Sequence, residues 1–158
     1  MSSDAPQTSI FRDRNFVMYL IGQTISTQGF WVEKIAMSWL AWSVTGSAFW
    51  TGLIAALHFA PAVLLGPVFG VMADRVDLRR TAMAINLMMA GTSFFLMALS
   101  FTGTVNLAWM VLIATCNGIL GSAMTPVRMA LVPVIVPRAF MSRAVTYTSM
   151  NFNLARLV

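Results

Sequence analysis

The sequence predicts an all-α membrane protein, and three observations support that prediction. Hydrophobic residues make up 58% of the chain and charged residues only 9%, whereas soluble domains carry roughly 25% charged residues. Mean hydropathy is +0.77. Neither the stretch from Ile35 to Ala73 nor the stretch from Thr81 to Val127 contains Asp, Glu, Lys or Arg. Uncharged stretches of this length indicate helices that cross a membrane in pairs.

The helices can be placed in order along the chain, since a spanning helix needs about 20 residues. A polar tail over 1–15 precedes one transmembrane bundle over 16–158. The predicted helices are 16–42, 48–72, 81–101 and 107–125, with a fifth beginning at about 139. The segments 43–47 and 102–106 are polar turns. Pro61 and Pro67 lie inside the second helix, which membrane helices tolerate because neighbouring groups satisfy the freed carbonyls. Pro126 marks the end of the fourth helix and opens a stretch that contains Pro133 and Pro137.

The basic residues predict the orientation. They fall in alternate connections: Arg12 and Arg14, then Arg75, Arg79 and Arg80, then Arg128, Arg138 and Arg143. The turns at 43–47 and 102–106 contain no Lys or Arg. The positive-inside rule therefore places the N-terminus in the cytoplasm. This placement also explains the net charge of +5 without a nucleic-acid partner, so membrane lipid is the predicted surrounding.

Two pairs of small residues have the spacing of close helix contacts. They are Gly66-x-x-x-Gly70 and Gly118-x-x-x-Ser122, and such pairs let two helix backbones approach. The alternative is that they arise by chance in glycine-rich apolar helices. Cys116 is the single cysteine, so no intrachain disulfide can form. The sequence has no phosphate-binding Gly-Lys-Ser/Thr loop and no cluster with metal-ligand spacing. It therefore predicts no enzyme, no cofactor and no metal site.

The segment Gly70–Arg79 (GVMADRVDLR) carries a resemblance to a known family. Gly70, Ala73, Asp74, Arg75 and Arg79 match the loop between the second and third helices of major facilitator superfamily transporters, whereas Asp77 and Leu78 depart from the common pattern. The Asp-Arg-x-Asp variant resembles the bacterial efflux branch that includes the enterobactin exporter. The segments 39–47, 126–133 and 153–158 resemble that branch too, so the resemblance extends from Phe11 onward.

This resemblance implies a function and a longer protein. Such transporters have twelve helices in two six-helix halves, so the chain is expected to be an N-terminal fragment whose partner is the missing C-terminal half. The expected activity is secondary efflux of an amphipathic small molecule, such as a drug or a siderophore, across a bacterial inner membrane. Protons would drive it by alternating access. The alternative is a non-transporting membrane protein of four or five helices that binds a partner, and an open reading frame downstream of Val158 would argue against it.

The resemblance also implies a conformational latch in the loop. Its residues are Gly70, Asp74, Arg75, Asp77 and Arg79. In the family the acid that matches Asp74 faces a helix N-terminus in the other half, where partial positive charge favours an anion. Arg75 and Arg79 would bridge to acidic groups nearby. The alternative is that the arginines only determine the orientation of the helices in the membrane, and this is the interpretation preferred for Arg80.

Three charges inside the apolar stretches form a candidate proton or substrate site: Glu33, Lys34 and Arg156. A charge in the middle of a membrane helix costs roughly 2.5–3.5 kcal/mol, so it needs a reason. Glu33 is a candidate proton carrier, because a carboxylate in such surroundings can titrate near neutral pH. The alternative places Glu33 and Lys34 at the outer interface or in a structural pair. Arg156 would bind an anionic substrate or pair with Glu33.

Three polar side chains in the apolar stretches have a structural interpretation. His58 is expected to pack or to bond a backbone carbonyl rather than relay protons. Asn86 and Asn117 are expected to form hydrogen bonds between helices.

Overall fold

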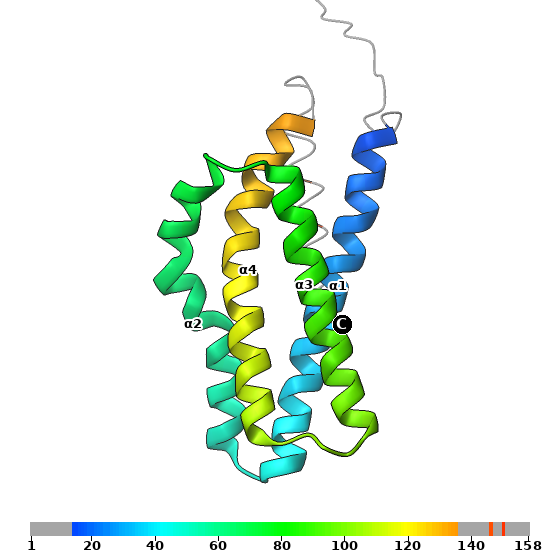
Figure 1. Ribbon diagram of the computed structural model, residues 1–158, viewed down its shortest axis with the longest axis vertical. Coiled ribbons are helices and arrows are strands. Elements are labelled where there is room, and N and C mark those ends of the chain that lie inside the picture. Colours follow the sequence, from blue (N-terminus) through cyan, green and yellow to red (C-terminus); the bar gives the residue numbers. More distant parts are fainter. Residues whose placement is uncertain (1–13, 136–145, 147–149, 151–158) are drawn as a thin grey trace, which may run out of the picture.

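A computed structural model describes residues 14–135, together with Thr146 and Met150 (Figure 1). Four long helices make up this part: α1 (Arg14–Thr45), α2 (Ala48–Ala73), α3 (Leu78–Phe101) and α4 (Leu107–Ile135). They run up and down side by side, so that the α2–α3 loop lies at the same end of the bundle as the start of α1 and the end of α4. No strand occurs among these residues. The predicted all-α fold class is confirmed.

Two short turns close the opposite end of the bundle. Gly46 (φ +60°) separates α1 from α2, and Gly103 (φ +67°) follows α3. Both lie in the left-handed region, where a residue without Cβ carries no steric penalty. The Gly46 N–H donates to the Trp42 carbonyl at 2.7 Å, and the Thr104 N–H donates to the Leu99 carbonyl at 3.1 Å. These bonds satisfy carbonyls at the helix ends and keep both connections short.

The loop between α2 and α3 is stabilised by Asp77. Its side chain accepts the backbone N–H of Arg80 at 3.0 Å and caps α3. The Arg80 Nε lies 3.4 Å from Asp77 Oδ2. An acidic N-cap satisfies one of the free N–H groups of a helix and favours its start. The cap explains why α3 begins at Leu78, three residues before the predicted position, so that Arg79 and Arg80 belong to its first turn.

The largest departure from the predicted boundaries concerns α4. The helix does not end near Thr125 but continues through Pro126 and Pro133 to Ile135. The buried side chains of Val127, Leu131 and Val132 hold this segment in the bundle, and a membrane helix tolerates the hydrogen bond that each proline removes. Arg128 therefore lies on a helix, not in a loop. The predicted fifth helix and Arg156 lie outside the described residues.

Three of these helices are long and apolar enough to cross a membrane: Ala48–Ala73, Leu78–Phe101 and Leu107–Val134. Helix α1 is more polar, but its 32 residues give it a length of about 48 Å at 1.5 Å per residue. Its polar side chains include Gln23 and Thr27, which are buried inside the bundle. Large apolar side chains point outward instead; Val63 is 79% exposed and Phe101 86%. Such a surface is suited to lipid, and the chain is a multi-pass membrane protein.

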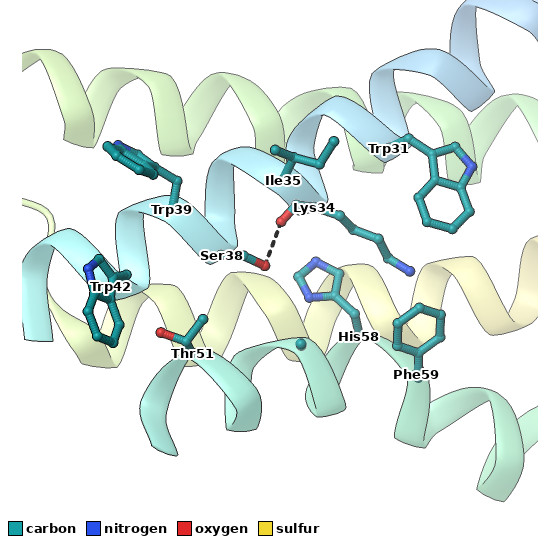
Figure 2. A pocket seen from close by; sticks show the side chains of 10 residues that line it. Trp31, Lys34, Ile35, Ser38, Trp39, Trp42, Thr51, His58 and Phe59 are labelled. Atoms are coloured by element: carbon teal, nitrogen blue, oxygen red, sulfur yellow. Dashed lines mark hydrogen bonds between the residues drawn. The ribbon is translucent and has the colours of Figure 1, made fainter. Parts of the chain in front are cut away.

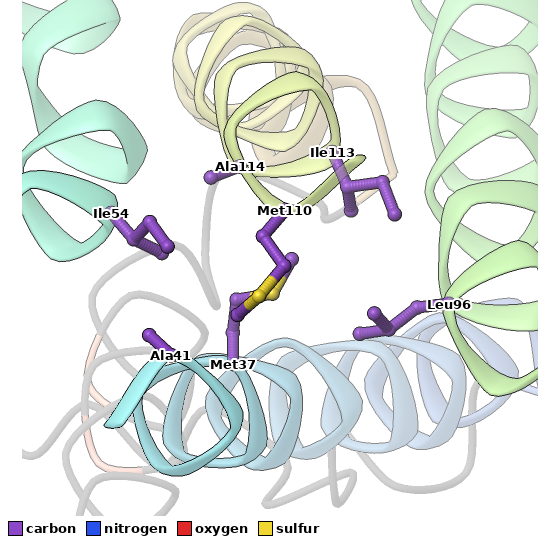
Figure 3. Packing of buried hydrophobic residues seen from close by; sticks show 7 residues of the cluster. All are labelled: Met37, Ala41, Ile54, Leu96, Met110, Ile113 and Ala114. Atoms are coloured by element: carbon purple, nitrogen blue, oxygen red, sulfur yellow. The ribbon is translucent and has the colours of Figure 1, made fainter. Parts of the chain in front are cut away.

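Two apolar clusters hold the helices together. The cluster nearer the glycine turns draws on all four helices (Figure 3) and contains Met37, Ala41, Ile54, Leu96, Met110, Ile113 and Ala114. The second lies at the other end and contains Ala73, Ile85, Met124 and Val127. Polar side chains of α1, α3 and α4 occupy the level between the two clusters.

Helices α2 and α4 touch at Gly118. A Cβ added there would lie 2.9 Å from Pro61 Cγ and 3.2 Å from the His58 carbonyl oxygen, and closer still to the Leu57 carbonyl oxygen. This confirms the close contact predicted from Gly118-x-x-x-Ser122. The pair Gly66 and Gly70 behaves differently, because a Cβ on either meets nothing within 4 Å in the described part of the chain. Within the described residues the predicted contact at this pair is not made, and α2, with two prolines inside it, is bent (Figure 1).

We expect Gly118→Ala to lower the thermal stability of the protein, because the new methyl group meets backbone oxygens that cannot rotate away. Gly91→Ala is the matched control. A Cβ at Gly91 in α3 meets nothing within 4 Å among the described residues, and Ala is favoured over Gly in a helix by about 1 kcal/mol. Melting temperatures in one detergent would compare the two variants. Equal stability of both would contradict the close contact.

Candidate functional site

Glu33 of α1 is held inside the bundle by side chains of two other helices. The Ser93 hydroxyl of α3 donates to Glu33 Oε2 at 2.6 Å. The Asn117 amide of α4, 1% exposed, donates to Glu33 Oε1. Both oxygens of the carboxylate thus have a donor, which is what a charge in a low-dielectric surrounding requires.

The hydrogen bonds continue into α3. Thr92 donates to Asn117 Oδ1 at 2.7 Å and is also 2.8 Å from the Met89 carbonyl. That same carbonyl lies 3.1 Å from the Ser93 hydroxyl. A hydroxyl has one proton and two lone pairs. Ser93 can therefore donate to Glu33, or donate to Met89 and accept a proton from Glu33 instead.

The two possible directions of the Ser93–Glu33 hydrogen bond allow Glu33 to be either ionised or protonated. With Glu33 ionised, Ser93 donates to the carboxylate. With Glu33 protonated at Oε2, the acid donates to Ser93 Oγ while the serine proton turns to the Met89 carbonyl. Either form has hydrogen-bond partners without any movement of the helices, so the network suits a carboxyl group that gains and loses a proton.

Lys34 points to a different side of α1, as expected for adjacent helical residues about 100° apart. Its Nζ lies 3.4 Å from the centroid of the Phe59 ring of α2, 4.5 Å from that of Phe30 and 5.0 Å from that of Trp31. A desolvated cation–π contact contributes about 2 kcal/mol, which offsets much of the roughly 3 kcal/mol cost of placing Lys in a membrane helix. These rings stabilise the ammonium inside the bilayer.

A cavity of about 610 Å³ lies between α1 and α2 beside Lys34 (Figure 2). Its lining is mainly aromatic, with a few polar groups: Trp31, Lys34, Ile35, Ser38, Trp39, Trp42, Thr51, Ala55, His58 and Phe59. His58 is bonded through Nδ1 to the Ile54 carbonyl at 3.1 Å, which confirms the predicted backbone bond. Pockets of this size and composition bind small molecules.

Arg128 forms a second polar centre between α4 and α1. Its guanidinium lies 3.5 Å from both Thr27 Oγ1 and Ser26 Oγ. Ser26 in turn donates to Asn86 Oδ1 of α3 at 2.8 Å. Asn86 and Asn117 both link helices, as predicted from the sequence. Within the described part of the chain no ion pair joins Arg128 to an acid.

The latch residues are far from Glu33 along the bundle. Gly70 is near the end of α2, Asp74 caps that end, and Arg79 lies in the first turn of α3 (Figure 1). Asp74, Arg75 and Arg79 are exposed, and no ion pair joins them to other residues that the structure describes. Asp77 differs from these residues, because its side chain already has a structural role as the N-cap of α3.

The structure thus pairs Glu33 with Ser93 and Asn117, and Lys34 with the aromatic pocket. Arg156 lies outside the described residues, so a pairing with Glu33 stays a prediction. Sequence reasoning missed Ser93 and the inward place of Arg128. An available signal for Arg128 was its position among buried apolar residues on both sides.

Charged side chains held inside a bundle of membrane helices mark functional sites, such as substrate and ion pathways. Comparison with known proteins gives the family. The chain belongs to the transmembrane secretion effector family, whose model matches residues 5–158, and its relatives place it among major facilitator superfamily transporters as an N-terminal part. The predicted family is confirmed.

Three relatives illustrate the similarity. The staphyloferrin A transporter of Staphylococcus aureus is 26% identical over 157 residues, covering 96% of this chain and 36% of the relative. Macrolide efflux protein A of Streptococcus pyogenes is 27% identical, covering 80% of this chain and 31% of the relative. The uncharacterized MFS-type transporter YkuC of Bacillus subtilis is 27% identical, covering 92% of this chain and 34% of the relative. The chain spans about a third of the length of these relatives. No solved structure matches it.

Proposed function

We propose that the chain forms part of a secondary active efflux transporter for amphipathic small molecules, driven by protons and working by alternating access. The rest of the transporter would supply the second half, and the bacterial inner membrane would be its site. Names of relatives support the substrate class, since one is a transporter of staphyloferrin A and another a macrolide efflux protein.

The observation that carries this proposal is the hydrogen-bonded Glu33. A half-buried carboxylate with partners for both of its protonation states, on Ser93 and Asn117, is suited to carry a proton. It lies one residue from Lys34, which faces the aromatic pocket. Proton site and pocket would therefore share one segment of α1, so movement of that segment would couple them.

The experiment is transport by inverted membrane vesicles that contain the transporter. The probes are erythromycin, staphyloferrin A and 2-naphthoate, each radiolabelled. We expect at least one probe to accumulate when a proton gradient is imposed, and accumulation to collapse with a protonophore. Accumulation that persists without the gradient would contradict proton coupling, and failure of all three would contradict the substrate class.

The orientation is part of the proposal. The loop 74–77, with the arginines at the start of α3, would face the cytoplasm together with the N-terminus. Arg128 lies on α4 and no longer counts as a loop residue. The proposed orientation therefore rests on the arginines of the α2–α3 loop region and on those in the sequence before α1 and after α4. The opposite end of the bundle holds exposed tryptophans, Trp42 and Trp109 among them, which suits a membrane–water interface.

Single cysteines at Ser47 and Val76, in a Cys116→Ala background, would test the orientation. Ser47 makes no side-chain cap bond and Val76 is 40% exposed, so both should accept the change. We expect an impermeant thiol reagent to label position 47 in intact cells and position 76 only after the membrane is opened. The reverse pattern would refute the orientation.

The loop would act as a latch between the two halves on the cytoplasmic side. Asp74 is exposed and has no ion-pair partner among the residues described, which leaves it available to a helix N-terminus in the other half. Asp77 would serve the latch indirectly by capping α3.

A further inference from the structure

We propose that the pocket between α1 and α2 binds an aromatic molecule that bears a hydroxyl or amide N–H group, and that His58 Nε2 accepts the hydrogen bond from that group. This rests on the proposed function, since it names the chemistry of the substrate. Such a ligand has one hydrogen-bond donor on an aromatic body.

His58 of α2 brings a buried ring nitrogen to the pocket wall. Its Nδ1 lies 3.1 Å from the Ile54 carbonyl oxygen, which can only accept, so Nδ1 carries the proton of this bond. The residue is 6% exposed, and burial favours the neutral ring because a buried charge costs far more than a buried neutral group. In the neutral ring Nε2 is then an acceptor. In Figure 2 the ring points from α2 toward α1.

This acceptor has no hydrogen-bond partner among the residues that the structure describes. Two hydroxyl groups line the same pocket, but each donates to a carbonyl of its own helix region. Ser38 donates to the Lys34 carbonyl at 3.0 Å, and Thr51 donates to the Ser47 carbonyl at 3.1 Å. Buried polar atoms in native proteins are almost always hydrogen-bonded. A donor that enters the pocket would therefore gain a bond to Nε2.

Aromatic side chains lie on both sides of His58. Figure 2 shows Trp39 and Trp42 on one side of its ring, and Trp31 and Phe59 on the other. Aromatic rings pack well against one another, edge to face or in offset stacks. The pocket has a volume of about 610 Å³, which lies in the range of sites for small molecules. One acceptor between two aromatic walls selects an aromatic body with a donor group.

Two sources could bring a donor to Nε2: a transported solute or a hydroxyl of a lipid headgroup. Both share the hydrogen bond that His58 would accept. We assign the pocket to an aromatic solute, because its aromatic walls suit a ring better than an acyl chain. The experiment separates the two sources.

The test is protection of a thiol in the pocket wall. Ala55 lines the pocket, so Ala55→Cys reports on occupancy once Cys116 and any other cysteine are changed to Ala. The complete transporter in phosphatidylcholine nanodiscs is labelled with a maleimide in the presence of 2-naphthol or 2-methoxynaphthalene. Both probes are neutral and share a ring system, but only 2-naphthol can donate a hydrogen bond. We expect 2-naphthol to protect at a concentration about tenfold lower than the ether.

Three variants locate the preference for the donor. His58→Phe should abolish it, because Phe keeps a ring and removes the nitrogen. His58→Gln should keep a preference of the same sign, because its side-chain oxygen can accept. Thr51→Val is the matched control and should leave the preference unchanged, since it removes a hydroxyl that already bonds within its own helix region. Gel filtration of each variant shows whether it is folded.

Three results would overturn the proposal. The first is equal protection by both probes in the transporter that retains His58, which decides the matter whichever variant folds. The second is a preference for 2-naphthol that persists in folded His58→Phe. The third is a thiol at position 55 that the maleimide cannot reach without any probe, because the second half of the transporter would then cover the pocket.

Repeating the assay in phosphatidylglycerol nanodiscs separates solute from lipid, because this headgroup bears hydroxyls and that of phosphatidylcholine bears none. Protection by 2-naphthol at the same concentration in both lipids would support a solute site. Protection by phosphatidylglycerol alone, lost in His58→Phe, would overturn that assignment. No gradient is present, so the result is independent of transport. Equal protection with gradient-driven efflux intact refutes this proposal alone, and the converse refutes only the proposed function.

Discussion

Glu33→Gln should abolish efflux driven by a proton gradient, to the level of empty liposomes, and leave exchange of substrate across the membrane intact. The reason is that Gln has almost the volume of Glu but cannot release a proton. A transporter that is always neutral at position 33 can still change between its inward-open and outward-open states with substrate bound. It cannot carry protons across the membrane, because position 33 no longer releases or takes up a proton. The measurement uses the complete transporter in proteoliposomes, with whichever of the three probes the wild type moves.

The geometry indicates that a glutamine side chain would fit at position 33. Its carbonyl oxygen would accept the bond from Asn117, as Glu33 Oε1 does. Its NH₂ group would face Ser93 Oγ, which can accept because its own proton has the Met89 carbonyl 3.1 Å away. Both polar atoms of the new side chain have a partner, so the variant imitates the protonated acid and should fold.

Exchange in the same vesicles is the control for this prediction. A purely structural Glu33 would predict poor folding and joint loss of exchange and of gradient-driven efflux. Normal gradient-driven efflux by the variant would exclude Glu33 as the carrier. His58 or an acid in the second half of the transporter would then be the next candidate.

Asp74→Asn should reduce transport about tenfold or more while expression and insertion stay near normal. Asn keeps the size of the side chain and removes the charge proposed to meet a helix N-terminus. That interaction is worth up to about 2 kcal/mol, and each 1.4 kcal/mol in a barrier is about tenfold in rate. Initial rates in inverted vesicles, normalised to the amount of transporter, would measure the effect.

Arg80→Gln is the matched control for Asp74→Asn. It removes a charge from the same loop region, where Arg80 pairs only with the exposed Asp77 among the residues described, and transport should remain near normal. If Asp74→Asn also transports normally, the loop is a topology signal and no latch. Equal losses in the two variants would contradict a specific role for Asp74.

Much of the fold could be predicted because the membrane imposes simple rules. Uncharged stretches and polar turns predicted four helices, and the structure contains them. Gly46 and Gly103 lie where the turns were expected, since those turns need left-handed backbone. Gly118 was recognised as a contact site from the Gly-x-x-x-Ser spacing, and in the structure a residue without Cβ there lets α4 approach the α2 backbone.

The end of α4 was mispredicted because Pro126 and Arg128 were read as loop signals. A proline and a basic residue close together often mark the end of a helix in a water-soluble protein. Here Val127 and Leu131 are buried against the bundle, and their packing outweighs the hydrogen bond lost at the proline. Arg128 consequently faces Ser26 and Thr27 of α1 rather than lying in a loop.

The partners of Glu33 could not be predicted from local pattern. Ser93 is 60 residues away and Asn117 is 84, so only the tertiary arrangement brings them to the carboxylate. The sequence did indicate that Glu33 and Lys34 point to different sides, because this follows from helical geometry alone. Which neighbours each would meet depended on the packing of α2, α3 and α4.

We propose that Glu33 couples substrate movement to proton movement. The most direct measurement adds substrate to proteoliposomes that contain the complete transporter and a trapped pH dye, with no initial gradient. We expect proton flux opposite in direction to the substrate, present in wild type and absent in Glu33→Gln although that variant still exchanges substrate. Substrate movement without any pH change in wild type, or an unchanged proton flux in Glu33→Gln, would contradict it.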